Sequence, residues 1–329
     1  MMRRKEAYEN ELNSRKSIHY FTSEHGKERD LLTSFYGHML SEDIHLGIMP
    51  IGGRTKNKLF KVMLKPQNAE IEDLIKNSLP THYGDPYDLK EAICDFIDEA
   101  AGLLAYYGVA YYEIVYYTAS EKPTRFELQH ISSDNIKDMF SFYWQYVPRV
   151  ALKYMEEGKR FIWLPRKRIV KIKFPNIIGG SNMQRKLIYN LAWLSECSVT
   201  PKFARDDMKK QKQQKDYDFM VYHKNENIFL AKITQHLGWP ARSLINDCAS
   251  EIYELYRHLK FEKTKAIIRQ AILDSLNKTL VNIGKEIGFN ALIEISGIPS
   301  ASDFDTYINK LLSGDMPFAK VAEVMKYDF

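Results

Sequence analysis

The stretch from residue 89 to 117 constrains the fold more than any other part of the chain. Its first half carries apolar side chains at helical spacing, at Leu89, Ile93, Phe96, Ile97, Ala100, Leu104 and Tyr107. Asp88 precedes this pattern and Glu91 follows three residues later, an arrangement typical of a helix N-cap. Gly108 ends it, because glycine adopts the left-handed C-cap conformation without a Cβ clash. The residues after Gly108 are β-branched and aromatic, so the stretch predicts one helix running directly into one strand.

Further strand patterns follow this central pair. Residues 125 to 131 alternate polar and apolar side chains and predict a partner for the preceding strand. Residues 140 to 147 read as another strand. Residues 169 to 174 place Ile169, Lys171 and Lys173 on one face and Val170, Ile172 and Phe174 on the other, the pattern of an antiparallel strand with one solvated face. The fold class predicted is therefore α+β with mostly antiparallel sheet.

Long helical patterns dominate the second half of the chain. Residues 241 to 285 contain no proline and recurrent apolar positions, which predict either one helix of roughly 65 Å or two helices with a break near Lys260 and Phe261. Residues 290 to 295 predict a strand, and Ser302 is the predicted cap of a final helix from 303 to 312. We divide the chain into an N-terminal arm (1–30), an α+β domain (31–180), a helical region with a basic segment (181–240) and long helices with a strand and a C-terminal helix (241–329).

Composition narrows the class of protein. The 329 residues are 45% hydrophobic and 27% charged, as in ordinary globular proteins. The three cysteines, Cys94, Cys197 and Cys248, are far apart and odd in number, so we expect reduced thiols in a cytoplasmic setting. Apolar runs are too short for a membrane span, and the first residues lack the apolar core of a signal peptide. The 21 tyrosines suit subunit contacts as well as an ordinary core.

A basic segment lies between residues 202 and 215. Its Lys and Arg positions are Lys202, Arg205, Lys209, Lys210, Lys212 and Lys215, against two acidic residues. The segment has too few large apolar side chains to bury a helical face. Two interpretations stay open: a surface that contacts the phosphates of nucleic acid, or a solvated helix or loop. A net charge of +5 is compatible with a polyanionic partner but does not require one.

Motifs for catalysis and metal binding are missing from the sequence. The glycines at 52 and 53 lack the spacing of a phosphate-binding loop, and the sequence has no zinc-protease or serine-hydrolase motif. A metal-dependent nuclease built from Asp85, Asp88 and Glu113 would lack the expected Glu-x-Lys spacing. The nine histidines are scattered. We therefore predict no enzymatic activity, no catalytic residues, no metal and no cofactor.

Three segments in order along the chain resemble the portal proteins of tailed phages. The first runs from Leu103 to Val115 (LLAYYGVAYYEIV), the second includes KPTRFEL at 122–128 and ISSDNI at 131–136, and the third is LPRKRIVKI at 164–172. Lys171 stands where a histidine is usual in that family. The resemblance covers about residues 85 to 180, with a looser likeness from 294 to 314.

This resemblance implies a portal-like fold, with a wing-like antiparallel sheet domain and stem- and crown-like long helices. It implies a homo-oligomeric ring, dodecameric in the family, around a channel for double-stranded DNA, with docking of a packaging motor and of neck or tail proteins. The expected location is the capsid vertex of a virion, after synthesis in the host cytoplasm and with no membrane partner. The alternatives are a monomeric or dimeric nucleic-acid-binding protein of a phage-defence or mobile genetic element, and an enzyme with an unrecognised site.

Overall fold

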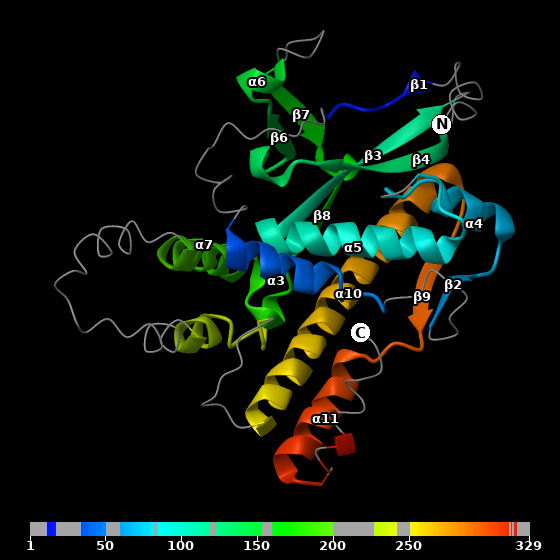
Figure 1. Cartoon of the computed structure of the whole chain (residues 1–329). Helices are drawn as coiled ribbons and strands as arrows, with labels where there is room; N and C mark the ends of the chain where they lie inside the picture. Colours follow the sequence, from blue (N-terminus) through cyan, green and yellow to red (C-terminus); the bar gives the residue numbers. More distant parts are fainter. Residues whose placement is uncertain are drawn as a thin grey trace.

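The computed structural model describes residues 12–17, 34–50, 60–81, 84–118, 123–152, 160–199, 227–241 and 251–315, together with 317, 319 and 320. Three antiparallel sheets and several long helices make up this part of the chain (Figure 1), so the predicted α+β class is confirmed.

The strands form one sheet of four and two smaller sheets. The four-stranded sheet contains β1 (Leu12–Asn13), β3 (Val109–Thr118), β4 (Pro123–Ile131) and β8 (Ile169–Lys173). A two-stranded sheet pairs β2 (Lys61–Lys65) with β9 (Leu292–Ser296). A three-stranded sheet contains β5 (Ile136–Asp138), β6 (Phe142–Tyr146) and β7 (Phe161–Pro165).

The helices labelled in Figure 1 are α3 (Phe35–His45), α4 (Ala69–Lys76), α5 (Leu89–Tyr107), α6 (Arg149–Leu152), α7 (Gly180–Val199), α10 (Glu251–Ile287) and α11 (Ala301–Ser313). Short 3-10 turns stand at η1 (Ser133–Asn135), η2 (Arg166–Arg168) and η3 (Asn176–Ile178). No helix among the described residues is long and apolar enough to cross a membrane.

The predicted helix and strand around Gly108 form as expected. The Asp88 carboxylate accepts a hydrogen bond from the Glu91 backbone N–H at 2.8 Å. The Glu91 carboxylate bonds the backbone N–H of Tyr87, at 2.7 Å, so the reciprocal bond is displaced one residue from that of a standard capping box. Gly108 caps α5 with a φ of 69°. A Cβ at this position would lie 2.7 Å from the Ser181 carbonyl oxygen, so glycine also permits α7 to begin against the end of α5.

One edge of β3 is shared by two strands. β8 pairs with its first half, from Val109 to Glu113, and β1 pairs with its end, at Tyr117 and Thr118. At the change of partner, the buried Glu113 carboxylate accepts hydrogen bonds from the backbone N–H groups of Lys16 and Ser17, at 2.9 and 2.8 Å. Residues 12–17 of the predicted arm therefore lie along the sheet edge; the rest of residues 1–30 lie outside the described residues.

Strand β8 differs in one respect from its prediction. Val170, Ile172 and Phe174 are buried in the main core, as the alternation predicts. Ile169, which was expected on a solvated face, is 9% exposed and packs in a small second cluster with Tyr143 and Leu164. The three-stranded sheet covers this end of the face, so the face is open to solvent only toward exposed Lys173.

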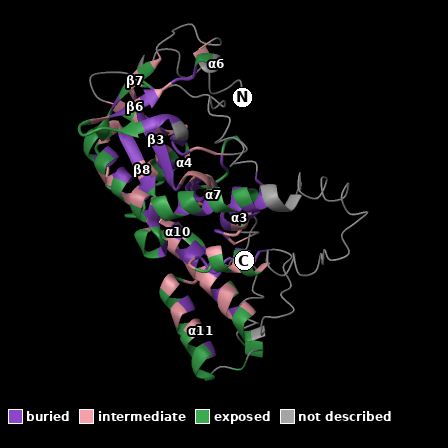
Figure 2. Ribbon diagram, turned by 90° about the vertical axis from the view of Figure 1, so that its left-hand side faces the viewer, coloured by how far each residue is buried: buried purple, intermediate pink, exposed green. Residues whose placement is uncertain are grey.

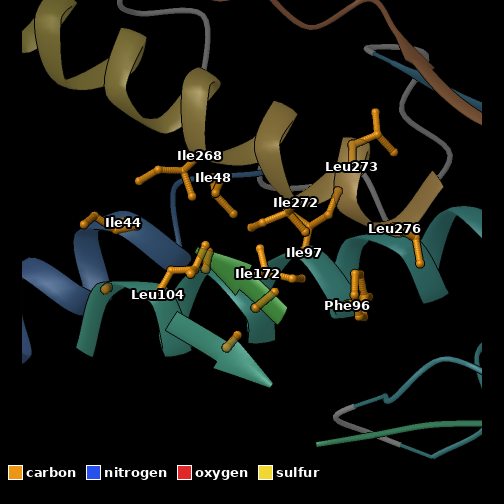
Figure 3. Packing of buried hydrophobic residues seen from close by; sticks show 14 of the residues in the cluster. Ile44, Ile48, Phe96, Ile97, Leu104, Ile172, Ile268, Ile272, Leu273 and Leu276 are labelled. Carbon is orange, nitrogen blue, oxygen red and sulfur yellow. The ribbon is translucent and has the colours of Figure 1, made fainter. Parts of the chain in front are cut away.

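The main core lies where α3, α5, α10 and β8 meet. Ile97 and Leu104 of α5, Ile272 and Leu276 of α10 and Ile172 of β8 are all buried in this one cluster. In Figure 3, Ile97 lies by Ile272, and Leu104 lies toward Ile44 of α3. This cluster draws on residues from 36 to 293, so it includes members of three of the four predicted segments. The predicted division into four segments describes the order of elements along the chain, and it stays a prediction.

Helix α10 is one continuous helix of 37 residues, about 56 Å long at 1.5 Å per residue. It has no break near Lys260 and Phe261, so the first of the two predicted alternatives holds for residues 251–287. Its C-terminal half packs in the main core, and its N-terminal half packs on α11 through a separate cluster of Leu255, Leu259, Ala266, Phe304 and Leu311. Figures 1 and 2 show the resulting helical hairpin extending away from the sheets.

The cap of α11 is Ser300, and the prediction of Ser302 was wrong. The Ser300 hydroxyl accepts from the Asp303 backbone N–H at 3.4 Å, and the Asp303 carboxylate accepts from the Ser300 backbone N–H at 2.8 Å. Spacing alone does not separate the two serines, because Asp305 stands three positions after Ser302. In the structure Asp303 completes the box with Ser300, whereas the Asp305 carboxylate pairs with Lys263 of α10. Cys94 is a buried free thiol in α5.

Candidate nucleic-acid interface

The predicted basic segment cannot be placed. Lys202, Arg205, Lys209, Lys210, Lys212 and Lys215 all fall between 200 and 226, outside the described residues. Their assignment to nucleic-acid binding therefore stays a prediction.

A second basic region is well described. The stretch from 160 to 195 contains eight Lys and Arg residues and no Asp or Glu. They are Arg160, Arg166, Lys167, Arg168, Lys171, Lys173, Arg185 and Lys186. This stretch runs through β7, η2, β8 and the first part of α7. We call it the basic band.

Part of the basic band opens onto a cleft of about 460 Å³, in which Lys171 and Lys173 of β8 and Arg185 of α7 line the walls. The cleft exists because the end of α5, the end of β8 and the start of α7 converge. Phe174 donates its backbone N–H to the Gly108 carbonyl at 3.0 Å, which joins the end of β8 to the cap of α5. Gly179 and Gly180, with φ values of 111° and 70°, turn the chain from β8 into α7.

Side chains of α7 fix its first turns against α5. The fully buried Gln184 donates from Nε2 to the Ala105 carbonyl at 2.6 Å. Arg185 donates from Nε to the Tyr107 carbonyl at 2.9 Å, so a cation lies at the C-terminal end of α5, where the helix dipole favours it. These two hydrogen bonds therefore hold the start of α7, which forms one wall of the cleft, against the end of α5.

Asp138 is the acidic residue among the groups that line the cleft. Burial alone raises the pKa of this carboxyl, but hydrogen bonding to Lys171 and the positive charges of Lys171, Arg166 and Lys173 outweigh that effect, so the pKa is lowered. Asp138 pairs with both Arg166 and Lys171. Exposed Lys173 makes no hydrogen bond or ion pair with any described residue, so the cleft keeps a surplus of positive charge.

The start of α7 adds to this positive potential. Its first residues, Gly180, Ser181 and Asn182, line the same cleft. The N-terminus of a helix of 20 residues carries partial positive charge. Charges and dipoles of this kind attract phosphate without reading bases. The cleft is thus suited chemically to an anionic backbone.

The chain has similar folds among solved structures. No protein-family model matches the sequence, and no curated protein matches it. A chain of the virion of native gene transfer agent (GTA) particle is similar to it, with a TM-score of 0.51 and 10% sequence identity over 92% of this chain and 93% of that chain. A chain of the neck of empty GTA particle computed with C6 symmetry is also similar, with a TM-score of 0.50 and 10% identity over 90% of this chain and 92% of that chain. At this identity the likeness shows a shared fold, extending over nearly the full length of each chain.

The carboxylates considered for a nuclease are not brought together. Asp88 caps the N-terminal end of α5, whereas Glu113 lies in β3, beyond the C-terminal end of that helix. The Glu113 carboxylate is also occupied by the backbone of residues 16 and 17. Within the described ranges, no group of three or more His, Cys, Asp and Glu side chains could hold a metal ion.

The basic band has sparse charges, so the density of lysines, which singles out residues 202–215, does not reveal it. The alternation predicts only a solvated strand face for Lys171 and Lys173, and no pattern singles out Arg185. The signal that could have found the band is the absence of acidic residues over a long stretch, which leaves even sparse basic charges uncompensated.

Proposed function

We propose that this chain is a ring-forming, portal-like structural subunit of a phage-like particle. In this proposal the ring surrounds a channel for double-stranded DNA during packaging and ejection, and docks a packaging motor and neck or tail proteins. The observation that carries the proposal is the fold shared with a chain of a GTA virion over nearly the whole of both chains. The order of portal-like segments in the sequence agrees with it. The proposed role is structural and requires no enzymatic activity.

The basic cleft supports contact with DNA in such a channel. DNA that slides needs weak, repeated contacts to phosphate and no base readout. Lys173 and the start of α7 provide positive charge without a deep, shape-specific pocket. We assign Lys173 and Lys186 of the basic band, and the segment from 202 to 215, to contacts with phosphate.

The mass of the purified protein tests the ring. One chain has a mass of 38.5 kDa, and light scattering should give a large multiple of it that corresponds to a closed assembly. A stable monomer at high protein concentration would reject the portal-like proposal. It would favour the alternative, a monomeric or dimeric nucleic-acid-binding protein, which the basic band alone also fits.

The salt dependence of DNA binding tests the basic band. Lys173→Gln combined with Lys186→Gln removes two exposed charges that make no hydrogen bond or ion pair with described residues. If both contact phosphate, the slope of log affinity against log salt becomes shallower by about 0.9 per contact. Lys61→Gln with Lys310→Gln is the matched control, because both lysines are exposed but lie outside the band. An unchanged slope in the first variant would show that the band does not face phosphate.

The undescribed segment is tested in the same way. Neutralising Lys209, Lys210, Lys212 and Lys215 should weaken DNA association and give a shallower salt slope. The same slope as in the unmodified protein would identify this segment as a solvated surface.

A further inference from the structure

The outer face of the three-stranded sheet is unusually aromatic. The alternation along β6 and β7 places Phe142, Trp144, Tyr146, Phe161 and Trp163 on one side. Facing strand positions are Trp144 with Trp163 and Tyr146 with Phe161. The opposite side is the packed one: Tyr143 and Leu164 are buried there in the small second cluster. We call the five outward rings the aromatic face.

The rings of the aromatic face contact one another; those of β6 are half-buried, and those of β7 stay open to solvent. Phe142 stacks on Trp163 with ring centroids 4.0 Å apart, and Trp144 lies 5.2 Å from Phe161. Trp163 is nevertheless 58% exposed and Phe161 50% exposed. The outer side of a sheet is normally polar, and contiguous exposed aromatic surface marks interaction sites. Trp, Tyr and Phe are also the residues enriched in protein interfaces.

The charge on this face is positive. Lys137 of β5 pairs in register with Trp144, so it points to the same side, and it is exposed. Arg160 lies over the Tyr146 ring, 5.2 Å from its centroid. The adjacent Asp138 points to the other side, where it pairs with Lys171. The strand positions on the aromatic face carry no acidic side chain, so an acidic partner surface is favoured.

The chain itself carries a surface of the required charge. Residues 68 to 91 contain six acidic residues, Glu70, Glu72, Asp73, Asp85, Asp88 and Glu91, against two lysines. Glu70, Glu72 and Asp73 are exposed on α4, and Asp85 and Asp88 are exposed before α5. Tyr87 stands among them and is 90% exposed. We call this surface the acidic edge.

The two surfaces lie toward opposite sides of the molecule. In the view of Figure 1, β6, β7 and α6 lie at the upper left, and α4 lies at the right. Two different surfaces placed in this way form a head-to-tail contact between copies, which repeats into a ring when the rotation between neighbours closes. A contact between identical patches would instead place the positive aromatic faces against each other.

We propose that the aromatic face of one copy docks on the acidic edge of the next copy. Exposed rings then become buried against the neighbour, and Lys137 and Arg160 meet carboxylates of α4 and of the segment before α5. This inference rests on the proposed ring, because it names the surfaces through which the subunits of that ring would join.

Charge reversal on each side tests the pairing. The first variant is Lys137→Glu with Arg160→Glu, and the second is Glu70→Lys with Glu72→Lys. Each variant alone places like charges across every contact, so light scattering should show a shift from the ring toward the 38.5 kDa monomer. An equal mixture of the two variants restores opposite charges at every contact when subunits alternate, so the mixture should recover the mass of the assembly.

Trp163→Ala tests the aromatic part of the contact. It should cause the same loss of assembly while circular dichroism shows an unchanged fold, because Trp163 is largely exposed. Tyr189→Ala is the matched control, since Tyr189 of α7 is 62% exposed and lies outside both surfaces.

The outcomes separate this inference from the proposed function. If the unmodified protein forms a ring but neither charge-reversal variant changes its mass, the pairing is wrong and the ring stands. The same conclusion follows if both variants lose the ring and their mixture does not regain it. If the unmodified protein is a monomer, the proposed function fails first and the pairing fails with it.

Discussion

The carboxyl of Glu99 in α5 has a perturbed pKa, and its effect on the stability of the fold can be measured. Burial raises the pKa of its carboxyl to about 7, from an ordinary value of 4.5. The Tyr112 hydroxyl, on the adjacent strand β3, lowers the pKa and offsets part of this effect, whereas the charge of Asp95, one turn earlier in α5, raises it further. Glu99→Gln keeps the shape of the side chain and removes the charge.

The expected effect follows from the difference between the folded and unfolded states. Because the folded protein holds the Glu99 proton more tightly than the unfolded chain, stability falls as the pH rises from about 4.5 to about 7. Each unit of pKa difference corresponds to 1.36 kcal/mol, so the shift implies an upper limit of about 3 kcal/mol. Above pH 7 Glu99 is ionised and lowers the unfolding free energy of the unmodified protein by this amount. Below pH 4.5 it is protonated and does not. The glutamine variant has no such loss at any pH.

Urea unfolding at several pH values between 5 and 8 measures this effect. Relative to the unmodified protein, Glu99→Gln should gain stability as the pH rises, by as much as about 3 kcal/mol across the range. Protein concentration is held constant, because association adds to apparent stability. Glu286→Gln, an exposed change on α10 outside both proposed contact surfaces, is the matched control. Parallel pH profiles for the Glu99 variant and the unmodified protein would show that folding does not raise the pKa of Glu99.

Three other substitutions test local features of the fold. Gly108→Ala should lower the thermal midpoint, because an alanine at a φ of 69° costs about 1–2 kcal/mol before its Cβ meets Ser181; an unchanged midpoint would contradict the close approach. Glu113→Gln should speed hydrogen exchange at the backbone amides of Lys16 and Ser17, since it removes a charged acceptor worth about 1–3 kcal/mol; unchanged exchange would mean that other contacts hold the arm. Ser300→Ala should cost about 1 kcal/mol of unfolding free energy and Ser302→Ala less, and the reverse order would restore Ser302 as the cap.

Local signals predicted the elements that depend on local interactions. The cap at Asp88, the left-handed Gly108 and the alternation from 125 to 131 each act within a few residues, and each predicted the helix or strand observed. The unbroken α10 was one of two alternatives, because its apolar positions serve two clusters. The two packed faces overlap along the helix: Phe261 lies in the main core, whereas Ala266, further along, still packs in the cluster with α11.

Pairings between distant segments could not be predicted. Strands β2 and β9 pair in a register that joins Lys61 to Ser296, and no local pattern records a contact across that distance. The same limit applied to the candidate site, whose cleft combines Asp138, Lys171 and Arg185 from three separate elements. The strand from 140 to 147 was recognised, but a run of aromatic residues does not show which side will be buried. Only the packing of Tyr143 and Leu164 identifies Trp144 and Trp163 as the outward side chains.

The distribution of charge is more informative than its total. A net charge of +5 conceals one stretch with eight basic and no acidic residues and another with six acidic and two basic residues. Exposed charges interact over a Debye length of about 8 Å at physiological salt, so a partner responds to the local surplus. The two proposed contacts also use different members of the basic band and its neighbours: Lys173 and Lys186 for phosphate, Lys137 and Arg160 for the next subunit. Salt should therefore weaken DNA association and subunit association through separate groups, and variants that alter one association can leave the other intact.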